Sequence, residues 1–540
     1  METAHVFAAS LMGCHANLIR VEARFEAHDK GRTDIQLTGL PDSVLRESRG
    51  RLLCAMRENR LGLGSGQLNI NLVPAAQPKV GEGLDLPLIL AAAACRGHLP
   101  GKRWMRTLFL GEVGIDGSLH AVRGGLAAGL AARDAHLTDL VAPPATAQEA
   151  ACLPELRAFA ANDLTQVLAH LSRDPSPLTP LAPPPDPPPG LESKSLDDVR
   201  GQALAKFALA VCASGGHRLL MIGPPGSGKS MLAARLPGLL PPASLIERLE
   251  MTRVLAACNR WPGHVARERP FRAPHHTASF AGMVGGGPNL MPGELTLAHR
   301  GVLFLDELPE FRREVLECLR QPLEDGSITI SRAGRQATLP ARVHLVAAMN
   351  PCPCGYLGHP TQPCRCAPFS IRRYRERISG PLLDRLDLRV EVGTPSLQEL
   401  LPASSSEVRA EVSPCAEEWK QRIHQAEGVR ASRGQTIRNV ELGPNELEQV
   451  APLHPDCLRL LQRAHARDTL SGRSVQSLRR VSRTLADLGG SEQVMVEHVA
   501  QALSLRKDLA VREEALGNSM SAHPKARPRA RADPPGGLGA

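Results

Sequence analysis

Eight consecutive residues near the middle of this chain have the composition of a loop that holds the phosphates of a nucleotide. They are Gly223, Pro224, Pro225, Gly226, Ser227, Gly228, Lys229 and Ser230, which match the pattern GxxxxGK[ST]. In such a loop the glycines let backbone amides approach the phosphates, the lysine reaches the β- and γ-phosphates, and the final hydroxyl ligates Mg²⁺. We therefore expect Lys229 to contact phosphate and Ser230 to ligate the metal ion.

The residues on either side of this loop favour the strand–loop–helix arrangement that phosphate binding requires. Residues 219–222 are all apolar and predict a buried strand, and residues 231–236 predict a helix. About one helix before the loop, Val199 and Gln202 are placed to wrap around the base of the nucleotide.

Two further apolar runs end in polar residues that could complete the site. Residues 302–305 lead into Asp306 and Glu307, and residues 343–348 lead towards Asn350. A carboxylate at the end of a strand can hold Mg²⁺, and a neighbouring glutamate can orient the water that attacks the γ-phosphate. We assign these two roles to Asp306 and Glu307, and we expect Asn350 to lie near the γ-phosphate. The alternative for the two acidic residues is a polar turn after a strand.

Four of the thirteen cysteines lie close together in two Cys-x-Cys pairs, Cys352 with Cys354 and Cys364 with Cys366. Four thiolates brought together can bind one tetrahedral Zn²⁺, and the polar loop between the pairs has no apolar core to order it. Such an ion would be structural, because four thiolates leave no coordination position open. Free thiols or a redox-labile pair are the alternatives, and His359 is an alternative ligand.

Residues 326–339 alternate polar and apolar residues around a central Ala-Gly pair, a pattern typical of a β-hairpin. Arg332 and Arg335 lie near its tip and could contact DNA phosphates without reading the bases. Ordinary solvated surface arginines are the alternative. Aromatic residues make up only 3% of the chain, which argues for contacts to the DNA backbone and against base stacking.

The composition excludes several other classes of protein. With 540 residues the chain is expected to hold two or three domains. It has no run of ~18 uncharged apolar residues, so we expect no membrane span. No basic segment followed by an apolar core opens the sequence, so we expect a cytoplasmic protein without a secretion signal. Its scattered cysteines favour thiols over a disulfide framework, and its net charge of +9 weakly favours a polyanionic partner.

Several longer motifs resemble those of one group of ATPases. They are RAPHHT at residues 272–277, PGE at 292–294, GVLFLDELPE at 301–310, NPCPCG at 350–355 and SGPLLDR at 379–385. Together they are similar to the motifs of the magnesium-chelatase-like AAA+ ATPases, and the chain is identified as a member of the bacterial ComM/YifB family over nearly all of residues 1–510. The resemblance implies a ring-forming ATPase, a hexamer that uses ATP and Mg²⁺ and acts on single-stranded or branched DNA.

The resemblance also assigns roles to two arginines. Arg385 matches the arginine finger of the family, which would reach the γ-phosphate bound by a neighbouring subunit. Arg473 matches the sensor arginine of the C-terminal helical domain. In the related helicases the hairpin that corresponds to residues 326–339 projects into the channel of the ring. For Arg480 and Arg483, which follow on the same helix as Arg473, the competing role is packing within the helical domain.

The N-terminal residues resemble the Lon-type protease fold, in particular residues 78–83 and 111–117. A working site of that type pairs a serine nucleophile with a lysine base. In this chain Gly83 stands at the serine position, the lysine position falls near Ala128, and residues 104–173 contain no lysine. We therefore expect an α+β domain that has the protease fold without its chemistry and acts as a structural or DNA-proximal platform.

These observations predict an α/β protein with three structural units. The predicted boundaries are 1–173 for the Lon-protease-like domain, 174–195 for a proline-rich linker, 196–400 for the AAA+ core with a parallel sheet and a Cys-rich loop at 351–367, 401–415 for a second linker, 416–512 for the C-terminal helical domain and 513–540 for a disordered basic tail.

The expected function is that of an ATP-dependent DNA motor, a branch-migration helicase that acts during natural transformation. Two alternatives stay open: the motor subunit of a metal-chelatase-like complex with a protein partner, and a DNA-binding scaffold with residual ATPase activity. The phosphate and magnesium chemistry serves the motor and the chelatase subunit equally. The arginine-bearing hairpin, the cysteine loop and the fused N-terminal domain favour the DNA motor.

Overall fold

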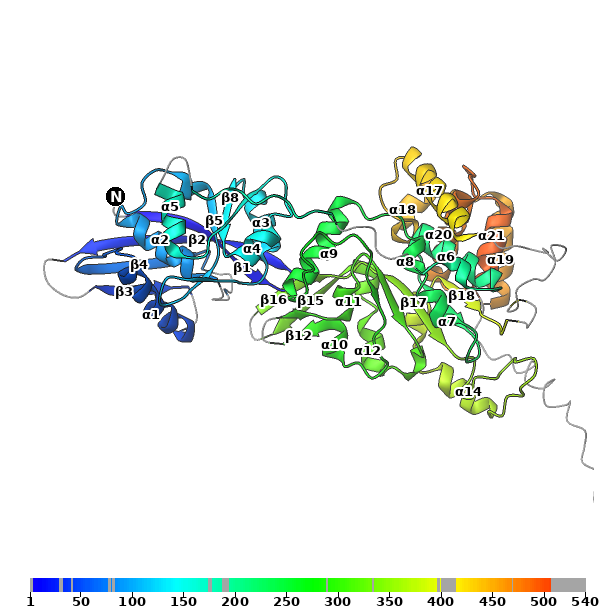
Figure 1. The fold of residues 1–540 in the computed structure, drawn as a ribbon. Coiled ribbons are helices and arrows are strands. Elements are labelled where there is room, and N and C mark those ends of the chain that lie inside the picture. Colours follow the sequence, from blue (N-terminus) through cyan, green and yellow to red (C-terminus); the bar gives the residue numbers. More distant parts are fainter. Residues whose placement is uncertain are drawn as a thin grey trace, which may run out of the picture.

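The computed structural model of the chain describes residues 3–28, 33–39, 42–75, 79, 83–172, 177–186, 194–287, 290–332, 335–395, 399, 414–468 and 470–506. The linkers predicted at 174–195 and 401–415 lie partly outside these residues, and the tail predicted at 513–540 lies wholly outside them. Figure 1 shows the N-terminal region in blue and cyan, a central α/β region in green, and the C-terminal helices in yellow to red.

A seven-stranded mixed sheet forms the framework of the N-terminal region, in the order β3-β4-β2-β1-β5-β8-β9. Its strands are β1 Thr3–Met12, β2 His15–Ala27, β3 Asp34–Thr38, β4 Gly66–Val73, β5 Thr107–Phe109, β8 Asp139–Ala142 and β9 Arg157–Ala160. Five helices accompany them in the described residues: α1 Asp42–Glu58, α2 Asp85–Cys95, α3 Gly125–Asp134, α4 Pro144–Ala150 and α5 Leu164–Ser172. Every residue of α2 is buried, because an apolar helix must be covered on all sides.

The central region is built on a five-stranded sheet in the order β11-β14-β17-β10-β18, with every neighbouring pair parallel. The strands are β11 Phe271–Arg272, β14 Val302–Leu305, β17 His344–Met349, β10 Leu219–Ile222 and β18 Leu388–Glu391. All residues of β10, β14 and β17 are buried, as expected for a parallel sheet that is covered on both faces. The carboxyl ends of these three adjacent strands therefore lie side by side.

The helix after the glycine-rich loop differs from the prediction. Residues 231–236 were predicted as one helix, but the structure has α7 Lys229–Ala233 and a separate short helix, α8 Leu236–Leu239. Pro237 explains the interruption, because proline has no backbone N–H to donate to the carbonyl of Ala233 and its ring would clash with that carbonyl. The strand predicted at 343–348 is observed one residue later, as β17.

The C-terminal helices share one hydrophobic core with the central sheet. They are α17 Ala416–Ser432, α18 Pro444–Val450, α19 Pro455–Asp468, α20 Gly472–Leu488 and α21 Val496–Ser504. Leu478, Val481 and Leu485 of α20 belong to the same buried cluster as Leu219 and Met221 of β10. Figure 1 shows these helices gathered at one end of the central region. This shared core fixes the position of α20 relative to the central sheet.

The N-terminal region packs directly on the central region. Leu249 of α9 (Leu245–Ala257) and Val265 lie in a buried cluster with residues of β5, α3 and α4. At the turn between β1 and β2, Gly13 approaches Leu339 so closely that an added Cβ would lie 2.5 Å from the leucine Cδ2. The described part of the proline-rich linker, residues 177–186, has no helix or strand, and Leu181 donates a backbone hydrogen bond to Ala158.

A helix that could cross a membrane needs a long apolar stretch. None of the helices within the described residues is long and apolar enough to do so.

Candidate functional site

The glycine-rich loop joins the carboxyl end of β10 to the first residue of α7, as a phosphate-binding loop requires. Gly226 and Gly228 have φ angles of +77° and +87°, a backbone conformation that side chains with a Cβ rarely adopt. Gly223 is constrained by space instead, because a Cβ there would lie 2.1 Å from the carbonyl oxygen of Val392. These three glycines therefore shape the loop for two different reasons.

Lys229 folds back over the loop. Its ammonium donates hydrogen bonds to the carbonyl oxygens of Gly223 at 2.7 Å and Pro224 at 2.8 Å, and it lies 3.4 Å from Oδ1 of Asn350. Burial lowers the pKa of the ammonium below its usual value, an effect that the carboxylate of Asp306 partly offsets. The structure thus brings Lys229 and Asn350 together, and phosphate oxygens could replace the carbonyl partners.

The two residues assigned to Mg²⁺ lie in contact. Ser230 at the start of α7 donates a hydrogen bond of 2.6 Å to Oδ2 of Asp306, which directly follows β14. They meet because the carboxyl ends of β10 and β14 flank that of β17 in the parallel sheet. A hydroxyl and a carboxylate are oxygen ligands of the kind that Mg²⁺ prefers. The residues present therefore fit a magnesium ion bound beside the phosphates.

Glu307 is held by a residue that the sequence analysis did not assign. Its carboxylate lies 3.2 Å from Nδ1 of His276, and its backbone has a φ of +52°, which is uncommon for a residue other than glycine. His276 lies within the RAPHHT motif at residues 272–277. This motif was the sequence signal that could have identified His276 as a site residue. The geometry adds His276 to the side chains at the carboxyl end of the sheet.

The two residues predicted near the nucleotide base behave differently. Val199 is buried in the core of the central region and is only 2% exposed. Gln202 directly precedes α6 (Ala203–Gly215), and its amide donates to the carbonyl oxygens of Ser227 in the loop and Gly393 after β18. Gln202 therefore braces the phosphate-binding loop, and a contact between either residue and a base stays a prediction.

Arg385 and the phosphate-binding loop lie at opposite ends of two neighbouring strands. It precedes β18, whose residues Leu388 and Glu391 pair with Leu219 and Ile222 of β10 in parallel. The loop follows the carboxyl end of β10, whereas Arg385 stands before the amino end of β18. The strands alone separate the two ends by about 10 Å. Arg385 therefore lies at the other end of these strands from the phosphate-binding loop of its own chain.

Arg385 and Arg473 meet at a shared acidic partner. Glu324, in α13 (Pro322–Asp325), lies 2.9 Å from the guanidinium of Arg385 and 3.0 Å from that of Arg473. Arg385 is 7% exposed and also donates to the carbonyl oxygens of Arg320 and Pro381, while the Arg473 side chain is half exposed. The structure thus brings the two predicted arginines together, but not at the phosphate site.

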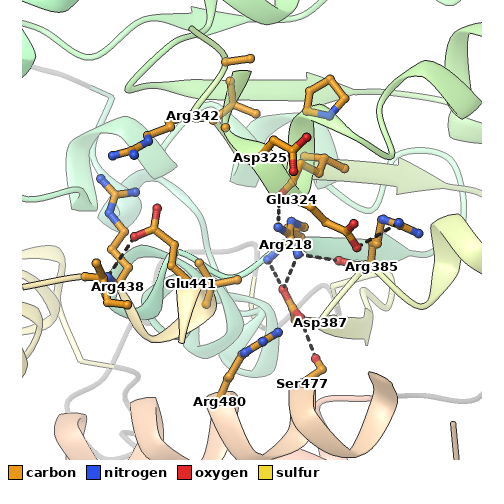
Figure 2. Close-up of a pocket in the computed structure, with 18 of the residues that line it drawn as sticks. Arg218, Glu324, Asp325, Arg342, Arg385, Asp387, Arg438, Glu441, Ser477 and Arg480 are labelled. Carbon is orange, nitrogen blue, oxygen red and sulfur yellow. Dashed lines mark hydrogen bonds and ion pairs between the residues drawn. The ribbon is translucent and has the colours of Figure 1, made fainter. Parts of the chain in front are cut away.

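These arginines line an open cavity of about 520 Å³ between the central region and the C-terminal helices. Figure 2 shows Arg218, Glu324, Arg385 and Asp387 on one side of the cavity, with Ser477 and Arg480 on the helix below. No residue of 223–230 lines it. Much of its surface is charged, which suits an anionic ligand or a second protein surface better than an apolar molecule.

The buried carboxylate of Asp387 fixes this arrangement. It accepts hydrogen bonds from Ser477 of α20 at 2.6 Å and from the backbone N–H of Arg218 at 3.0 Å (Figure 2). Burial alone would raise the pKa of Asp387, but Arg218, His217 and these hydrogen bonds together hold it below its usual value. An ionised Asp387 therefore ties α20 to the start of both β10 and β18.

Arg480 and Arg483 of α20 take the packing role that was the alternative for them. Arg480 donates to the carbonyl oxygen of Leu442 at 2.8 Å. Arg483 is 1% exposed and donates to the carbonyl oxygens of Ser491 at 2.6 Å and Glu492 at 2.8 Å, both beyond the end of α20. Both side chains therefore join parts of the helical region to one another.

The predicted hairpin is present as β15 Ser327–Arg332 and β16 Arg335–Pro340, which pair antiparallel. Its two tip residues lie outside the described part of the chain. Arg332 is exposed and stands opposite Arg335, which is half-buried. A second, shorter hairpin is formed by β12 Gly285–Gly286 and β13 Met291–Pro292. The two hairpins lie close together, since a Cβ added to Gly285 would approach Ile330 at 3.2 Å.

The four cysteines of the Cys-rich loop also come together. Their sulfur atoms all lie within 4.8 Å of one another, between the end of β17 and the start of α14 (Pro368–Arg375). Among the described residues they form the one group of at least three cysteine, histidine or acidic side chains with spacing suited to a metal ion.

The positions that correspond to a Lon-type dyad carry no functional group. Gly83 lies against the side chain of Val122, with a φ of +82°, and Ala128 is buried within α3. Lys79, the one lysine close to Gly83 in sequence, is buried and donates to the carbonyl oxygen of Pro74 at 2.6 Å. These side chains offer no serine–lysine pair.

Sequence comparisons match the chain to known families in three segments. The pattern of the magnesium chelatase subunit ChlI matches residues 195–400, and the pattern of the C-terminal part of that subunit matches residues 404–506. A further pattern, described as subunit ChlI of Mg-chelatase, matches residues 21–146.

Full-length relatives cover the chain more completely. The competence protein ComM of Haemophilus influenzae is 37% identical over 518 residues, which span 94% of this chain and 98% of the relative. The uncharacterized protein YifB of Escherichia coli is 37% identical over 518 residues, spanning 94% of this chain and 97% of the relative. The DNA replication licensing factor mcm6 of Dictyostelium discoideum is 26% identical over 227 residues, 41% of this chain and 24% of that protein.

Proposed function

The chain belongs to the ComM/YifB family of magnesium-chelatase-like AAA+ ATPases, and we propose that it is a ring-forming, ATP-driven DNA motor. Within this family assignment ATP and Mg²⁺ are the cofactors, held by Lys229 and by Ser230 with Asp306. Bound Mg²⁺ would neutralise charge on the phosphates, while Glu307 orients the attacking water and Asn350 contacts the γ-phosphate. We place the motor in the cytoplasm, where it meets its DNA substrate.

One observation carries the proposal that the motor is a ring. Arg385 precedes the amino end of β18, away from the phosphate-binding loop, and it meets Arg473 at Glu324 beside a charged cavity. From this position we propose that Arg385 reaches the phosphates bound by a neighbouring subunit, where it would stabilise the charge of the transition state. Subunits that complete one another's sites head to tail close into a ring, and a hexamer is the form we propose.

DNA is proposed as the substrate because of the two hairpins. β12–β13 and β15–β16 lie side by side, and Arg332 is exposed close to the tip of the second one. An exposed cation near the tip of a hairpin suits the phosphate backbone of DNA, with affinity that does not depend on sequence. The relatives point the same way: one is named a competence protein and another a DNA replication licensing factor. We therefore propose branch migration of DNA during natural transformation as the activity.

The test is ATP hydrolysis by the purified chain with and without single-stranded, forked and four-way DNA. We expect strong stimulation by DNA and its loss in Glu307→Gln, which keeps the size of the side chain but removes the carboxylate. Stimulation that is greatest with four-way DNA would support branch migration, and displacement of labelled strands from a four-way junction would then measure it directly.

The second candidate function is that of a motor subunit in a metal-chelatase-like complex. The matches to both parts of subunit ChlI favour it. Hydrolysis that ignores every DNA but responds to a copurifying protein would support this candidate over the DNA motor. Firm DNA binding with hydrolysis that does not respond to it would instead indicate a DNA-binding scaffold.

A further inference from the structure

The sulfur atoms of the Cys-rich loop, residues 351–367, have the spacing of a metal site. Cys352 Sγ lies 3.4 Å from Cys354 Sγ and 3.6 Å from Cys364 Sγ. The sulfurs of Cys354 and Cys364 are 3.6 Å apart. Tetrahedral zinc with Zn–S bonds of about 2.3 Å separates its ligands by about 3.8 Å. The observed spacing fits that geometry, and it is too long for disulfide bonds of about 2.05 Å.

The surroundings favour a structural ion over a catalytic one. Cys352 is completely buried, and the other three cysteines are half-buried. With Cys366 as the fourth ligand, the tetrahedral shell is complete and has no open position for water or substrate. His359, the alternative ligand, has another role, because its Nδ1 accepts backbone hydrogen bonds from Thr361 and Gln362 within the loop.

The loop has little else to hold it in one conformation. Residues 355–363 contain no helix or strand. The rings of Tyr356 and His359 meet edge to face with their centroids 5.7 Å apart, and both residues belong to the loop itself. A segment of this kind that lacks an apolar core gains its order from a crosslink, and a bound metal supplies one.

The Cys-rich loop is linked to the phosphate site in two ways. Gly355, with a φ of +85°, lies so close to Pro225 that an added Cβ would be 2.6 Å from the proline Cδ. Cys352 follows Asn350 by two residues, and the Asn350 side chain lies 3.4 Å from the ammonium of Lys229. The sulfur cluster is therefore connected to the phosphate-binding loop both through the chain and through space.

We propose that Cys352, Cys354, Cys364 and Cys366 bind one structural zinc ion, and that this ion holds the Cys-rich loop against the phosphate-binding loop. On binding, four Zn–S bonds form and the thiol protons pass to solvent, with no change of oxidation state. The second part of the proposal rests on the proposed function, because it assumes that residues 223–230 bind ATP. The first part does not.

Metal content tests the first part. The full chain, purified without an immobilised-metal step, should contain one zinc per chain by mass spectrometry of the elements. Loading with Co²⁺ should give the charge-transfer absorption of a thiolate complex. Both signals should vanish in Cys364→Ser/Cys366→Ser and persist in Cys415→Ser. Cys415 is a suitable control because it caps α17 by accepting a hydrogen bond from Glu418, which serine can also accept.

A pair of glycine variants tests the second part without removing a ligand. Gly355→Ala should keep its zinc but bind a fluorescent ATP analogue about tenfold more weakly, because the added Cβ would displace Pro225 of the phosphate-binding loop. Gly358→Ala is the matched control. It has a similar φ of +78°, but an added Cβ there meets nothing within 4 Å. Its affinity for the analogue should stay close to that of the unmodified chain.

The outcomes separate the two parts of the proposal. A chain that contains no zinc and takes up neither Zn²⁺ nor Co²⁺ overturns it, whatever its ATPase activity. Zinc that persists in the double-serine variant overturns the assignment of the ligands. Equal analogue binding by Gly355→Ala and Gly358→Ala overturns the support of the phosphate loop. If the zinc-loaded chain binds no ATP analogue at all, the proposed function and with it the supporting role are overturned, but the metal assignment stands.

Discussion

Nδ1 of His276 lies 3.2 Å from a carboxylate oxygen of Glu307. Glu307 is the side chain proposed to orient the attacking water, and His276 belongs to the segment between β11 and α10 (Phe280–Val284). That segment continues through α10 into the β12–β13 hairpin, one of the two hairpins proposed to meet DNA. The pair therefore links the carboxylate proposed to act in hydrolysis to a hairpin proposed to contact DNA.

We predict that His276→Ala lowers kcat for ATP hydrolysis by about 10- to 100-fold, less than Glu307→Gln does, because the variant keeps the carboxylate but loses its orientation. The KM for ATP should change little, since the imidazole pairs with the carboxylate and not with the phosphate loop. Steady-state kinetics with and without DNA measure both constants. His276→Asn, which can still donate to Glu307, should recover part of the rate. An unchanged kcat in the alanine variant would contradict the positioning role.

The place of Arg385 predicts complementation between two inactive variants. Arg385→Ala and Glu307→Gln should each hydrolyse ATP very slowly alone. In a random equal mixture, about one quarter of the interfaces place an intact Glu307 site against an intact Arg385, so activity should reappear. Hydrolysis by the mixture, with subunit exchange confirmed by native mass spectrometry, makes this measurement. Mixed rings that stay inactive would show that Arg385 does not act across the interface.

The sequence predicted the chemistry that consecutive residues carry. The loop at 223–230 and the carboxylates after β14 could be recognised because polar residues at the ends of parallel strands meet at one edge of the sheet. Glu324 could not be recognised as the common partner of Arg385 and Arg473. Three separate segments bring these side chains together, and only the packing of α20 on the central sheet makes them neighbours.

The same reasoning explains the smaller errors. The helix predicted at 231–236 was wrong because the apolar pattern was weighed without the missing N–H of Pro237. The contact between Gly13 and Leu339 had no sequence signal, since it depends on how two separately folded regions meet.

Glu149 should make stability depend on pH. Burial raises the pKa of its carboxyl to about 7, although Leu126 at the start of α3 donates a hydrogen bond to it. Because the folded pKa lies above the usual 4.5, folding favours the protonated form. The stabilisation is complete below about pH 4.5 and is lost as the pH rises through 7. A shift of this size corresponds to about 3 kcal/mol at most.

Glu149→Gln mimics the protonated form and should remove this dependence. We expect the variant and the unmodified chain to have similar apparent melting temperatures at pH 5, and the variant to melt several degrees higher at pH 8. Thermal melts across this range are the measurement, with Glu155→Gln, an exposed residue of the same region, as the control. If the difference in melting temperature between Glu149→Gln and the unmodified chain stays constant from pH 5 to 8, a buried, protonated Glu149 is contradicted.

Arg332 provides the sharpest test of the proposed contact between the β15–β16 hairpin and DNA. If its guanidinium contacts phosphate, Arg332→Ala should weaken the binding of all DNA sequences alike. It should also reduce the slope of log affinity against log salt concentration by about 1 for each phosphate that the variant no longer neutralises. Fluorescence anisotropy with a labelled single strand at several salt concentrations measures both quantities.

A change of affinity alone would not identify the hairpin, because removing any positive charge weakens binding to a polyanion at low salt. Arg463→Ala controls for this effect, since Arg463 is exposed on α19, outside both hairpins. Arg332→Lys keeps the charge and should retain most of the salt slope. If Arg332→Ala and Arg463→Ala shift affinity and slope equally, the β15–β16 hairpin is not the DNA contact. A reduced slope confined to Arg332→Ala would support a phosphate contact at the β15–β16 hairpin.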